Sequence, residues 1–232
     1  MSGELTWYRT EDGSYTLFTR RFGEHYHSVH GACQESRHIF IQAGLLFWLE
    51  QYRAAANQFA CAAEDKVHPA VCRVFEAGFG TGLNAWLTVQ AAAEAGFSCR
   101  YEAVEWYPLA PEDLPPWPDD ALFAALHAAP WQTDVAVSPH MTLRKRKEDL
   151  TQMLPCGPFD VVYFDAFSPA VQPEMWTEEV FGRLFRSMAF GGVLVTYCAK
   201  GTVRRTLCAT GFRVERLPGP PGKREMLRAV KR

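Results

Sequence analysis

Residues 71–96 have the sequence VCRVFEAGFGTGLNAWLTVQAAAEAG, and this segment carries the pattern that predicts the fold class. The apolar run at its start predicts a buried strand. The glycines at positions 78, 80 and 82 predict a tight turn, and the helical pattern that follows closes at Gly96. A strand, a glycine-rich turn and a helix in this order are typical of the ligand-binding unit of doubly wound α/β proteins.

The same alternation continues to the end of the chain. Apolar or alternating runs predict further strands at 99–106, 141–147, 159–167, 191–199, 211–217 and 224–232. Helical patterns lie between them, at 119–129, 148–154, 173–188 and 202–209. Strands that alternate with helices predict right-handed crossovers. We therefore expect an α/β fold with a doubly wound, mostly parallel seven-stranded sheet and a C-terminal antiparallel hairpin.

The N-terminal part has a different character. Residues 1–40 are rich in turn-forming and aromatic residues, and SYTLFTRRFGEHYHS at 14–28 predicts a β-hairpin. Apolar residues from Ile39 to about Ala56 follow a helical spacing. We expect residues 1–60 to form a β-rich extension, a hairpin plus a helix, that packs on a catalytic domain of residues 61–232.

Composition excludes several classes of protein. The chain has 232 residues, of which 48% are hydrophobic and 22% are charged, so it contains enough apolar material for a core. No apolar run approaches the roughly 18 residues of a membrane span, and the N-terminus lacks the apolar region of a signal peptide. The seven cysteines form no C-x-x-C pair, which favours a reducing compartment over a disulfide framework. We expect a cytoplasmic protein.

Charge is distributed unevenly along the chain. Residues 200–232 contain ten basic and two acidic residues, a net charge of +8, whereas the whole chain has a net charge of −2. This basic tail favours a polyanionic partner that docks at one end of the molecule. A solvated basic face is the alternative.

The glycine turn favours one kind of ligand. Its spacing is G-x-G-x-G. Leu83 stands where a dinucleotide-binding motif, G-x-G-x-x-G, has its third glycine, so that motif is not met. Glu76 would repel a pyrophosphate but suits a ligand with a cationic amino acid, such as S-adenosylmethionine. Glu105, at the end of the next strand, is placed to accept the two ribose hydroxyls. The sequence therefore favours S-adenosylmethionine over a nicotinamide cofactor.

A second acidic position follows the strand at 159–164. The chain order of a doubly wound sheet reverses beside the first strand, so YFDAFSP at 163–169 should lie next to the glycine turn. Its Asp-x-Phe-x-Pro pattern is similar to the loop with which amino-group methyltransferases orient the target nitrogen and stack on its carrier. Asp165 and Phe167 are therefore the catalytic candidates. Asp149 is a candidate partner of the adenine amino group, although Asp149 and Asp165 also suit helix caps or turns.

Six blocks of sequence carry a more specific resemblance. In chain order they are ESRHIFI (35–41), EAGFGTGLN (76–84), EWYPL (105–109), DAFSPAVQPEMWT (165–177), TVRRTLCATGF (202–212) and GKREML (222–227). From about Tyr26 to Arg228 the chain resembles the MnmC-like (MnmD) tRNA methyltransferases. The resemblance implies a class I, Rossmann-like methyltransferase fold. It also implies transfer of a methyl group from S-adenosylmethionine to 5-aminomethyl-2-thiouridine at the tRNA wobble position, which gives 5-methylaminomethyl-2-thiouridine.

The resemblance and the motifs together define the expected site. Cofactor-binding residues are expected to be Tyr26, Ser28, Glu35, Glu76, Gly78, Phe79, Gly80, Thr81, Gly82, Asn84, Glu105, Asp149 and Asp165. Arg204, Arg205, Lys223 and Arg224 from the basic tail are expected to contact tRNA phosphates near the anticodon. Phe167 or Trp176 is expected to stack on an unpaired base, with core packing as the alternative, the more so for Trp176. Glu148 stands where relatives can have glycine, which makes the adenine contact of Asp149 the less certain of the two nucleoside contacts.

Other cofactors and partners are not expected. The chain stops at Arg232 without the flavin-dependent module of some relatives, so we expect no flavin and no conversion of the carboxymethylaminomethyl precursor. His25, His27 and His30 form an H-x-H-x-x-H cluster, but methyl transfer from a sulfonium needs no metal, and we interpret the cluster as part of the hairpin. We expect a monomer with no membrane association and no protein partner.

The chemistry sets a requirement on Asp165. A free alkylamine resembles lysine, with a pKa of about 10.4, so only about one molecule in two thousand is neutral at pH 7. Desolvation and a nearby sulfonium lower that pKa, whereas an ionised Asp165 raises it. We therefore expect Asp165 chiefly to orient the amine, with the proton lost to water or to this carboxylate.

Three other functions remain compatible with the pattern. An aminopropyltransferase, or a methyltransferase of another small amine, also pairs a glycine turn with an aspartate near an amine. A non-catalytic RNA-binding module would use the basic tail alone. A nicotinamide dehydrogenase is disfavoured by Leu83.

Overall fold

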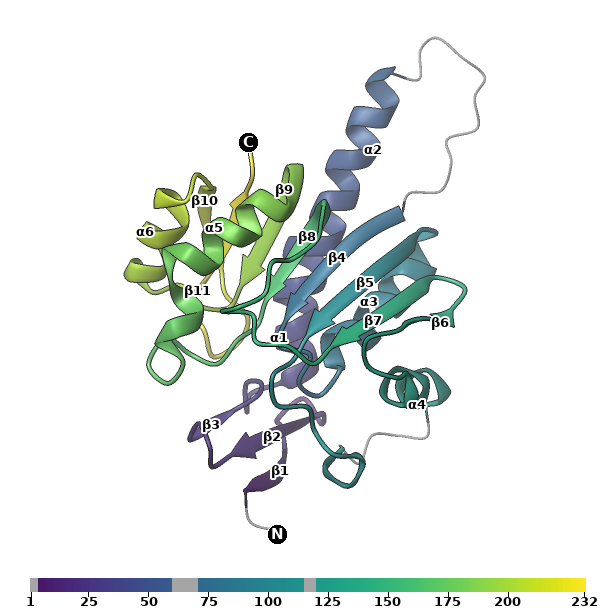
Figure 1. Cartoon of the computed structure of the whole chain (residues 1–232), viewed down its shortest axis with the longest axis vertical. Helices are drawn as coiled ribbons and strands as arrows, with labels where there is room; N and C mark the ends of the chain where they lie inside the picture. The colour runs from purple at the N-terminus through teal and green to yellow at the C-terminus, as the bar shows by residue number, and fades with distance from the viewer. Residues whose placement is uncertain (1–3, 60–70, 115–119) are drawn as a thin grey trace.

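The computed structural model describes residues 4–59, 71–114 and 120–232, and a mixed sheet of eight strands lies at its centre (Figure 1). In spatial order the strands are β10 (Arg213–Pro218), β11 (Glu225–Val230), β9 (Met188–Thr196), β8 (Phe159–Phe164), β4 (Val71–Ala77), β5 (Ser98–Val104), β7 (Met141–Arg146) and β6 (Asp134–Ser138). The five strands from β9 to β7 are parallel. The doubly wound α/β fold and the C-terminal antiparallel hairpin are confirmed.

The sheet has one strand more than predicted. The extra strand, β6, pairs antiparallel with β7 at the edge of the sheet, and Asp134 lies opposite Arg144. Its five residues are exposed or half-buried. An edge strand of this kind lacks the apolar run that identifies a buried strand, which explains why the seven-strand prediction omitted it.

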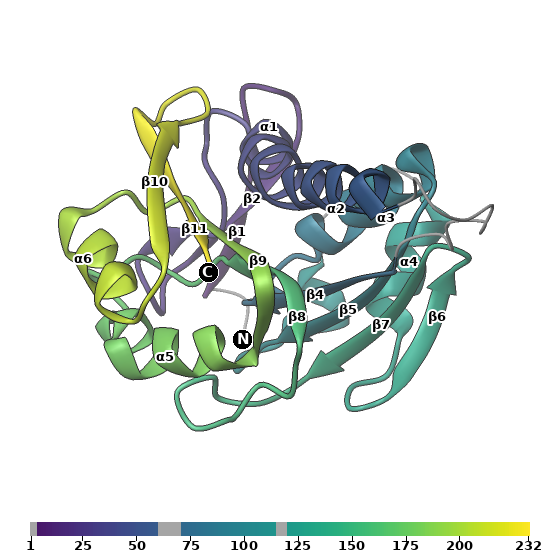
Figure 2. The ribbon, with the colours of Figure 1, turned by 90° about the horizontal axis from the view of Figure 1, so that it is seen from above.

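Helices cover both faces of the sheet (Figure 2). One face carries α1 (Ala32–Ser36), a π-helical segment η1 (Arg37–Leu46), α2 (Phe47–Phe59), α3 (Leu83–Ala95) and α4 (Ala121–Ala128). The other face carries α5 (Glu178–Ser187) and α6 (Gly201–Ala209), and short 3₁₀ turns lie at η3 (Pro111–Asp113) and η4 (Pro173–Trp176). The first helix begins at Ala32 rather than Ile39. The helix predicted at 148–154 is instead a turn, in which the Asp149 carbonyl accepts the N–H groups of residues 152 and 153.

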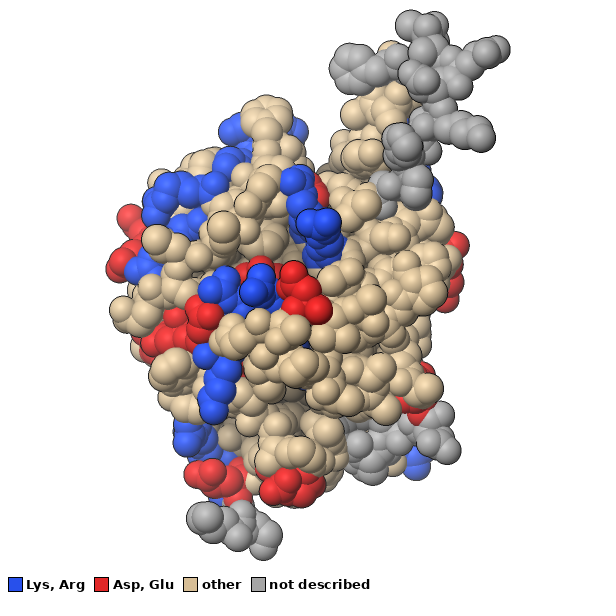
Figure 3. All heavy atoms as spheres, turned by 45° about the vertical axis from the view of Figure 1, so that its right-hand side comes forward, with Lys and Arg blue, Asp and Glu red and all other residues tan. Residues whose placement is uncertain are grey.

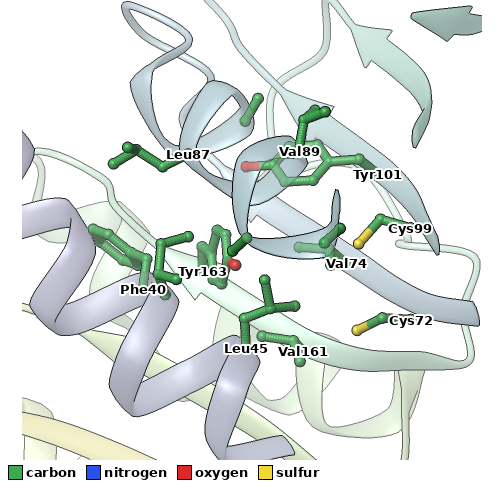
Figure 4. Packing of buried hydrophobic residues seen from close by; sticks show 14 of the residues in the cluster. Phe40, Leu45, Cys72, Val74, Leu87, Val89, Cys99, Tyr101, Val161 and Tyr163 are labelled. Atoms are coloured by element: carbon green, nitrogen blue, oxygen red, sulfur yellow. The ribbon is translucent and has the colours of Figure 1, made fainter. Parts of the chain in front are cut away.

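Strand β8 separates two apolar cores. All six of its residues are buried, as in a parallel strand with helices on both sides. Val161 and Tyr163 pack with Phe40 and Leu45 of η1 in one core (Figure 4). Val162 and Phe164 belong to the other core, with residues of α5 and α6.

A second, smaller sheet is formed by the N-terminal residues. Strands β1 (Leu5–Arg9), β2 (Tyr15–Thr19) and β3 (Glu24–His25) pair antiparallel in that order. This sheet lies beyond the ends to which the arrows of β4, β5 and β7 point (Figure 1). It therefore faces the edge of the large sheet at which ligands bind in doubly wound folds. The predicted domain boundary at 60/61 lies outside the described residues.

No helix within the described ranges combines the length and the apolar character needed to cross a bilayer.

Candidate functional site

A cavity of about 400 Å³ opens at the carboxyl ends of the central strands. Its walls come from the loops that follow β4, β5, β7, β8 and β9, and residues 22 and 24–28, in and around β3, also line it. The loops after β4 and β8 contact each other, because these two strands are neighbours in the sheet. The predicted proximity of the glycine turn and Asp165 is therefore confirmed.

The glycine turn is shaped by close contacts with the rest of the chain. Gly78 and Gly80 have φ angles of 94° and 50°, values that favour glycine. A Cβ atom on Gly78 would lie 3.0 Å from the carbonyl oxygen of Asp165, and one on Gly80 would lie 2.9 Å from the ring of Tyr26. Side chains here would push the turn away from both neighbouring walls of the cavity.

Glu105 supports the glycine turn and lines the cavity. One carboxylate oxygen accepts the N–H of Gly80 at 3.0 Å, and the other accepts the N–H of Tyr107 at 2.8 Å. Burial raises the pKa of this carboxyl group, and the backbone hydrogen bonds lower it in part.

Asp149 combines the two roles that its sequence context suggested. It lines the cavity, and its Oδ1 atom accepts both the N–H and the hydroxyl of Thr151 at 2.8 Å. Its second oxygen has no hydrogen bond to the residues that the structure describes. Asp149 thus caps a turn and still presents an acceptor at the cavity.

Asn84 joins two carboxyl groups at the base of the site. Its amide nitrogen donates to Oε1 of Glu76 at 2.9 Å and to Oδ2 of Asp165 at 2.8 Å. Its Oδ1 atom is buried without a partner among the described residues. Glu76 is fully buried, and burial holds the pKa of its carboxyl well above the usual range.

Glu76, Thr81 and Gly82 are not among the residues that line the cavity, so the cofactor contacts predicted for them stay predictions. Glu76 lies behind Asn84, so it acts on the site through that side chain. The hydroxyl of Thr81 contacts the ring of His27, and Gly82 packs against His127. The other residues predicted to bind the cofactor do line the cavity.

Asp165 is a buried acid that borders the cavity. Its side chain is 8% exposed, and burial raises its pKa to about 7. The negative charge of Glu35 adds to the increase in pKa, whereas the Asn84 hydrogen bond and the charge of Lys223 oppose it. A carboxyl group with this pKa exchanges a proton near neutral pH.

Phe167 belongs to an aromatic cluster in the cavity wall. Its ring stacks on Phe22 with centroids 4.4 Å apart and meets Tyr26 edge to face at 5.0 Å. Trp176, by contrast, is only 6% exposed, and its Nε1 donates to the carbonyl of Phe167 at 2.8 Å. Trp176 is therefore a core residue that supports the loop.

The N-terminal candidates meet at one corner of the cavity. Glu35 is buried; its Oε2 atom accepts the N–H of Ser28 at 2.7 Å and its Oε1 atom forms an ion pair with Lys223. The Lys223 ammonium also lies 4.1 Å from the ring centre of Tyr197. Lys223 is thus part of the cavity wall rather than a free surface cation.

The other three predicted phosphate contacts lie on the surface. Arg204 and Arg205 are exposed on α6, Arg224 is exposed beside Lys223, and none of them forms an ion pair with a described residue. Other basic residues of the tail are paired, as Arg228 is with Glu215 at 2.9 Å. On the face drawn in Figure 3, basic and acidic side chains are interspersed. The +8 net charge already counts Glu215 and Glu225, so among the described residues only the ion pair of Lys223 with Glu35 reduces the free positive charge of the tail further.

Several residues that line the cavity were not predicted as site residues, and two of them, Glu24 and His27, contact the Asp165 loop. Glu24 accepts the N–H of Ser168 at 3.1 Å and also its hydroxyl, which fixes the Asp165 loop to the N-terminal sheet. His27 places Nδ1 4.0 Å from Oδ2 of Asp165. The histidine cluster was the sequence signal for His27, but its histidines point to different places: His27 faces Asp165, whereas His30 contacts Glu11 at the surface. Within the described part of the chain, no group of three histidine, cysteine, aspartate or glutamate side chains is arranged to hold a metal.

Comparison with known proteins agrees with this geometry. Residues 129–232 match the model of a family described as S-adenosyl-L-methionine-dependent methyltransferase. The protein from Pseudomonas fluorescens named tRNA 5-methylaminomethyl-2-thiouridine biosynthesis bifunctional protein MnmC is 36% identical over 227 residues, which is 90% of this chain and 32% of that protein. Its counterpart from Aromatoleum aromaticum is 33% identical over 94% of this chain and 34% of that protein.

A solved structure matches nearly the whole chain. The crystal structure of MnmC2 from Aquifex aeolicus aligns with a TM-score of 0.78 at 25% identity, and the match covers 99% of this chain and 70% of that one. The chain spans about a third of the length of the curated relatives it matches. The chain is therefore similar over residues 129–232 to a family of S-adenosyl-L-methionine-dependent methyltransferases, and over most of its length to about a third of the MnmC proteins.

Proposed function

We propose that this protein transfers a methyl group from S-adenosylmethionine to the primary amine of 5-aminomethyl-2-thiouridine at the tRNA wobble position, giving 5-methylaminomethyl-2-thiouridine. One observation carries the proposal. A single cavity joins the glycine turn and Glu105 at one side to Asp165 and Phe167 at the other. The names of the matched MnmC relatives supply tRNA and the product nucleoside of this proposal, and the substrate is that nucleoside without the transferred methyl group.

The residues present fit S-adenosylmethionine. Glu105 and Asp149 offer carboxylate acceptors to a ribose and an adenine amino group, and the buried, unpaired Oδ1 of Asn84 is an acceptor that a cationic amino group would satisfy. When bound, S-adenosylmethionine supplies an electrophilic methyl group on sulfur, and the carbon–sulfur bond breaks as the carbon–nitrogen bond forms. Tyr26 and Ser28 then close the cofactor side of the cavity.

At the amine side, Asp165 orients the nucleophile and accepts its proton. A substrate ammonium that enters this buried corner stabilises the ionised form of Asp165, whose pKa is about 7. Proton transfer to Oδ1 or Oδ2 then gives the neutral amine that methyl transfer requires. Phe167 offers a ring on which the uracil can stack, and Arg204, Arg205 and Arg224 hold phosphates of the anticodon arm.

The N-terminal segment completes the site in this proposal. Residues 1–60 form a unit that packs on the methyltransferase domain of residues 61–232 and contributes Tyr26, Ser28 and Glu35 to the cavity. The aminopropyltransferase and the non-catalytic RNA-binding module are not favoured, since the matched family and relatives are methyltransferases and MnmC proteins.

The direct test is methyl transfer from labelled S-adenosylmethionine to tRNA that lacks only this methyl group, followed by analysis of the product nucleosides. We expect label in 5-methylaminomethyl-2-thiouridine. Tight cofactor binding without transfer to this tRNA would refute the substrate and redirect the search to other amines.

A variant assigns the role of Asp165. Asp165→Asn keeps an acceptor oxygen but cannot take a proton, so we expect a slower reaction without the ionisation near pH 7. A near-normal rate with the wild-type pH dependence would exclude an acid–base role and leave orientation alone.

A further inference from the structure

His27 lies at the point where the N-terminal sheet meets Asp165. Its backbone is fixed by the hydroxyl of Thr16, which accepts the His27 N–H at 3.0 Å and donates to the His27 carbonyl at 2.9 Å. Its side chain is 7% exposed and lines the cavity. The imidazole is therefore held in place before any ligand binds.

The two ring nitrogens have different neighbours. Nε2 lies 3.1 Å from the Thr81 hydroxyl, and Nδ1 faces Oδ2 of Asp165 at 4.0 Å. A hydroxyl either donates or accepts. If Thr81 donates to Nε2, the proton of the neutral ring is on Nδ1 and points to the carboxylate. The opposite tautomer would direct a lone pair at an ionised carboxylate, which is unfavourable.

The charges around this pair favour a neutral ring. Burial lowers the pKa of His27 to about 4; Glu35 opposes this decrease and Lys223 adds to it. The same two charges act on Asp165, and Asn84 supplies its hydrogen bond from the opposite side. Lys223 forms an ion pair with Glu35, and the His27 ring lies 4.0 Å from Oδ2 of Asp165.

We propose that His27 is a positioning residue for methyl transfer: its Nδ1–H, set by the hydroxyl of Thr81, orients the ionised carboxylate of Asp165 towards the amine. This inference rests on the proposed function. A distance of 4.0 Å is longer than a hydrogen bond. Catalytic hydrogen bonds are often long in the free enzyme and shorten in the complex, and we expect this contact to shorten when the substrate ammonium ionises Asp165.

Two substitutions distinguish the roles of the two ring nitrogens of His27. In His27→Asn the amide nitrogen takes the place of Nδ1 and keeps the donor towards Asp165. In His27→Gln the amide takes the place of Nε2 and keeps only the contact with Thr81. The matched control is His30→Gln, because His30 is exposed, pairs with Glu11 and does not line the cavity.

The measurements are single-turnover methyl transfer to tRNA between pH 5.5 and 9 and calorimetric binding of S-adenosylhomocysteine. Loss of a donor raises the pKa of a carboxylate. We expect His27→Gln to be about tenfold slower at pH 7, with the rising limb of its pH profile moved up by about one unit. His27→Asn should keep the wild-type profile, and cofactor affinity should not change in either variant. Equal loss in both variants, or an unchanged profile in His27→Gln, would overturn the proposal.

Nitrogen NMR of the wild-type protein provides a readout that needs no activity. We expect His27 to be the neutral Nδ1–H tautomer at pH 7.5 and its Nδ1 signal to move in Asp165→Asn. A protonated Nε2 with a bare Nδ1, or no response to Asp165→Asn, would contradict the inference. If the wild-type protein transfers no methyl group to tRNA, the proposed function fails, and the NMR result alone then decides whether His27 positions Asp165.

Discussion

Removal of the Glu105 charge tests how the cofactor side of the cavity is built. The carboxylate holds the N–H groups of Gly80 and Tyr107 at 3.0 and 2.8 Å. Glu105→Gln preserves the shape of the side chain but replaces one acceptor with an NH₂ group, which faces a backbone N–H and cannot bind it. The glycine turn loses one support, and a ribose hydroxyl loses a charged acceptor.

The expected magnitude follows from these bonds. A hydrogen bond to a charged group contributes about 1.5–3 kcal/mol, and 1.4 kcal/mol corresponds to a tenfold change in affinity. Loss of one such bond should therefore weaken binding of S-adenosylhomocysteine by about 10- to 140-fold. Because burial raises the pKa of Glu105, wild-type affinity should also fall as pH decreases through that raised value, a dependence that Glu105→Gln lacks.

Isothermal titration calorimetry measures both effects. Glu102→Gln is the matched control, because Glu102 lies on β5, which ends just before Glu105, and it pairs with Arg146 at 3.0 Å away from the cavity. Binding of tRNA should be equal in the wild-type protein and both variants. Cofactor affinity of Glu105→Gln within twofold of wild type would refute the reasoning, because Glu105 would then neither support the glycine turn nor contact the nucleoside.

Three further predictions concern the helices, a buried lysine and the tail. Gly44→Ala places a Cβ atom 2.9 Å from Val195, so it should reduce the free energy of unfolding by about 1–3 kcal/mol in urea titrations, whereas Gly182→Ala, with only a 3.5 Å contact, should not. The Lys145 ammonium is buried against two carbonyls at the end of α4, and burial lowers its pKa to about 8. The unfolded chain therefore binds more protons between about pH 8 and 10, so the wild-type protein should gain stability relative to Lys145→Met as pH rises through that window. For the tail, charge reversal should weaken tRNA binding and reduce its salt slope by about one per lost contact, measured by filter binding at several salt concentrations. The residues to reverse are Arg204, Arg205 and Arg224. An unchanged salt dependence of tRNA binding would show that they do not contact the tRNA.

The sequence predicted those parts of the structure that depend on local pattern and on the rules of sheet topology. The apolar run of β8 and the glycine turn after β4 are visible in any window of the chain, and the crossover rule brings their carboxyl ends together. Strand β6 was missed because an exposed edge strand has no apolar run. The start of the first helix was misplaced because Ala32–Ser36 contains little of the apolar spacing that marks the rest.

Site residues were predicted less well where long-range contacts decide their role. Glu24 bonds to Ser168 and Lys223 pairs with Glu35, residues that are far apart in the sequence. No periodicity in the chain reports such pairs. Glu76 was assigned to the ligand because its carboxylate suits a cationic amino acid, whereas its depth in the core depends on the position of α3, which no local pattern reports.

The Asn84 amide couples the two halves of the site. Both of its hydrogens are used, one by Glu76 and one by Asp165, so the orientation of the amide is fixed. An ionised carboxylate cannot donate a hydrogen bond, so an aspartate at position 84 would bring three acids together without the donors that hold them. Asn84 lies in the first turn of α3, directly after the glycine turn, and its side-chain amide nitrogen donates to Asp165, the acid that faces the amine. A shift of the glycine turn therefore moves Asp165 as well, which means that the cofactor side and the amine side of the cavity are positioned by one side chain.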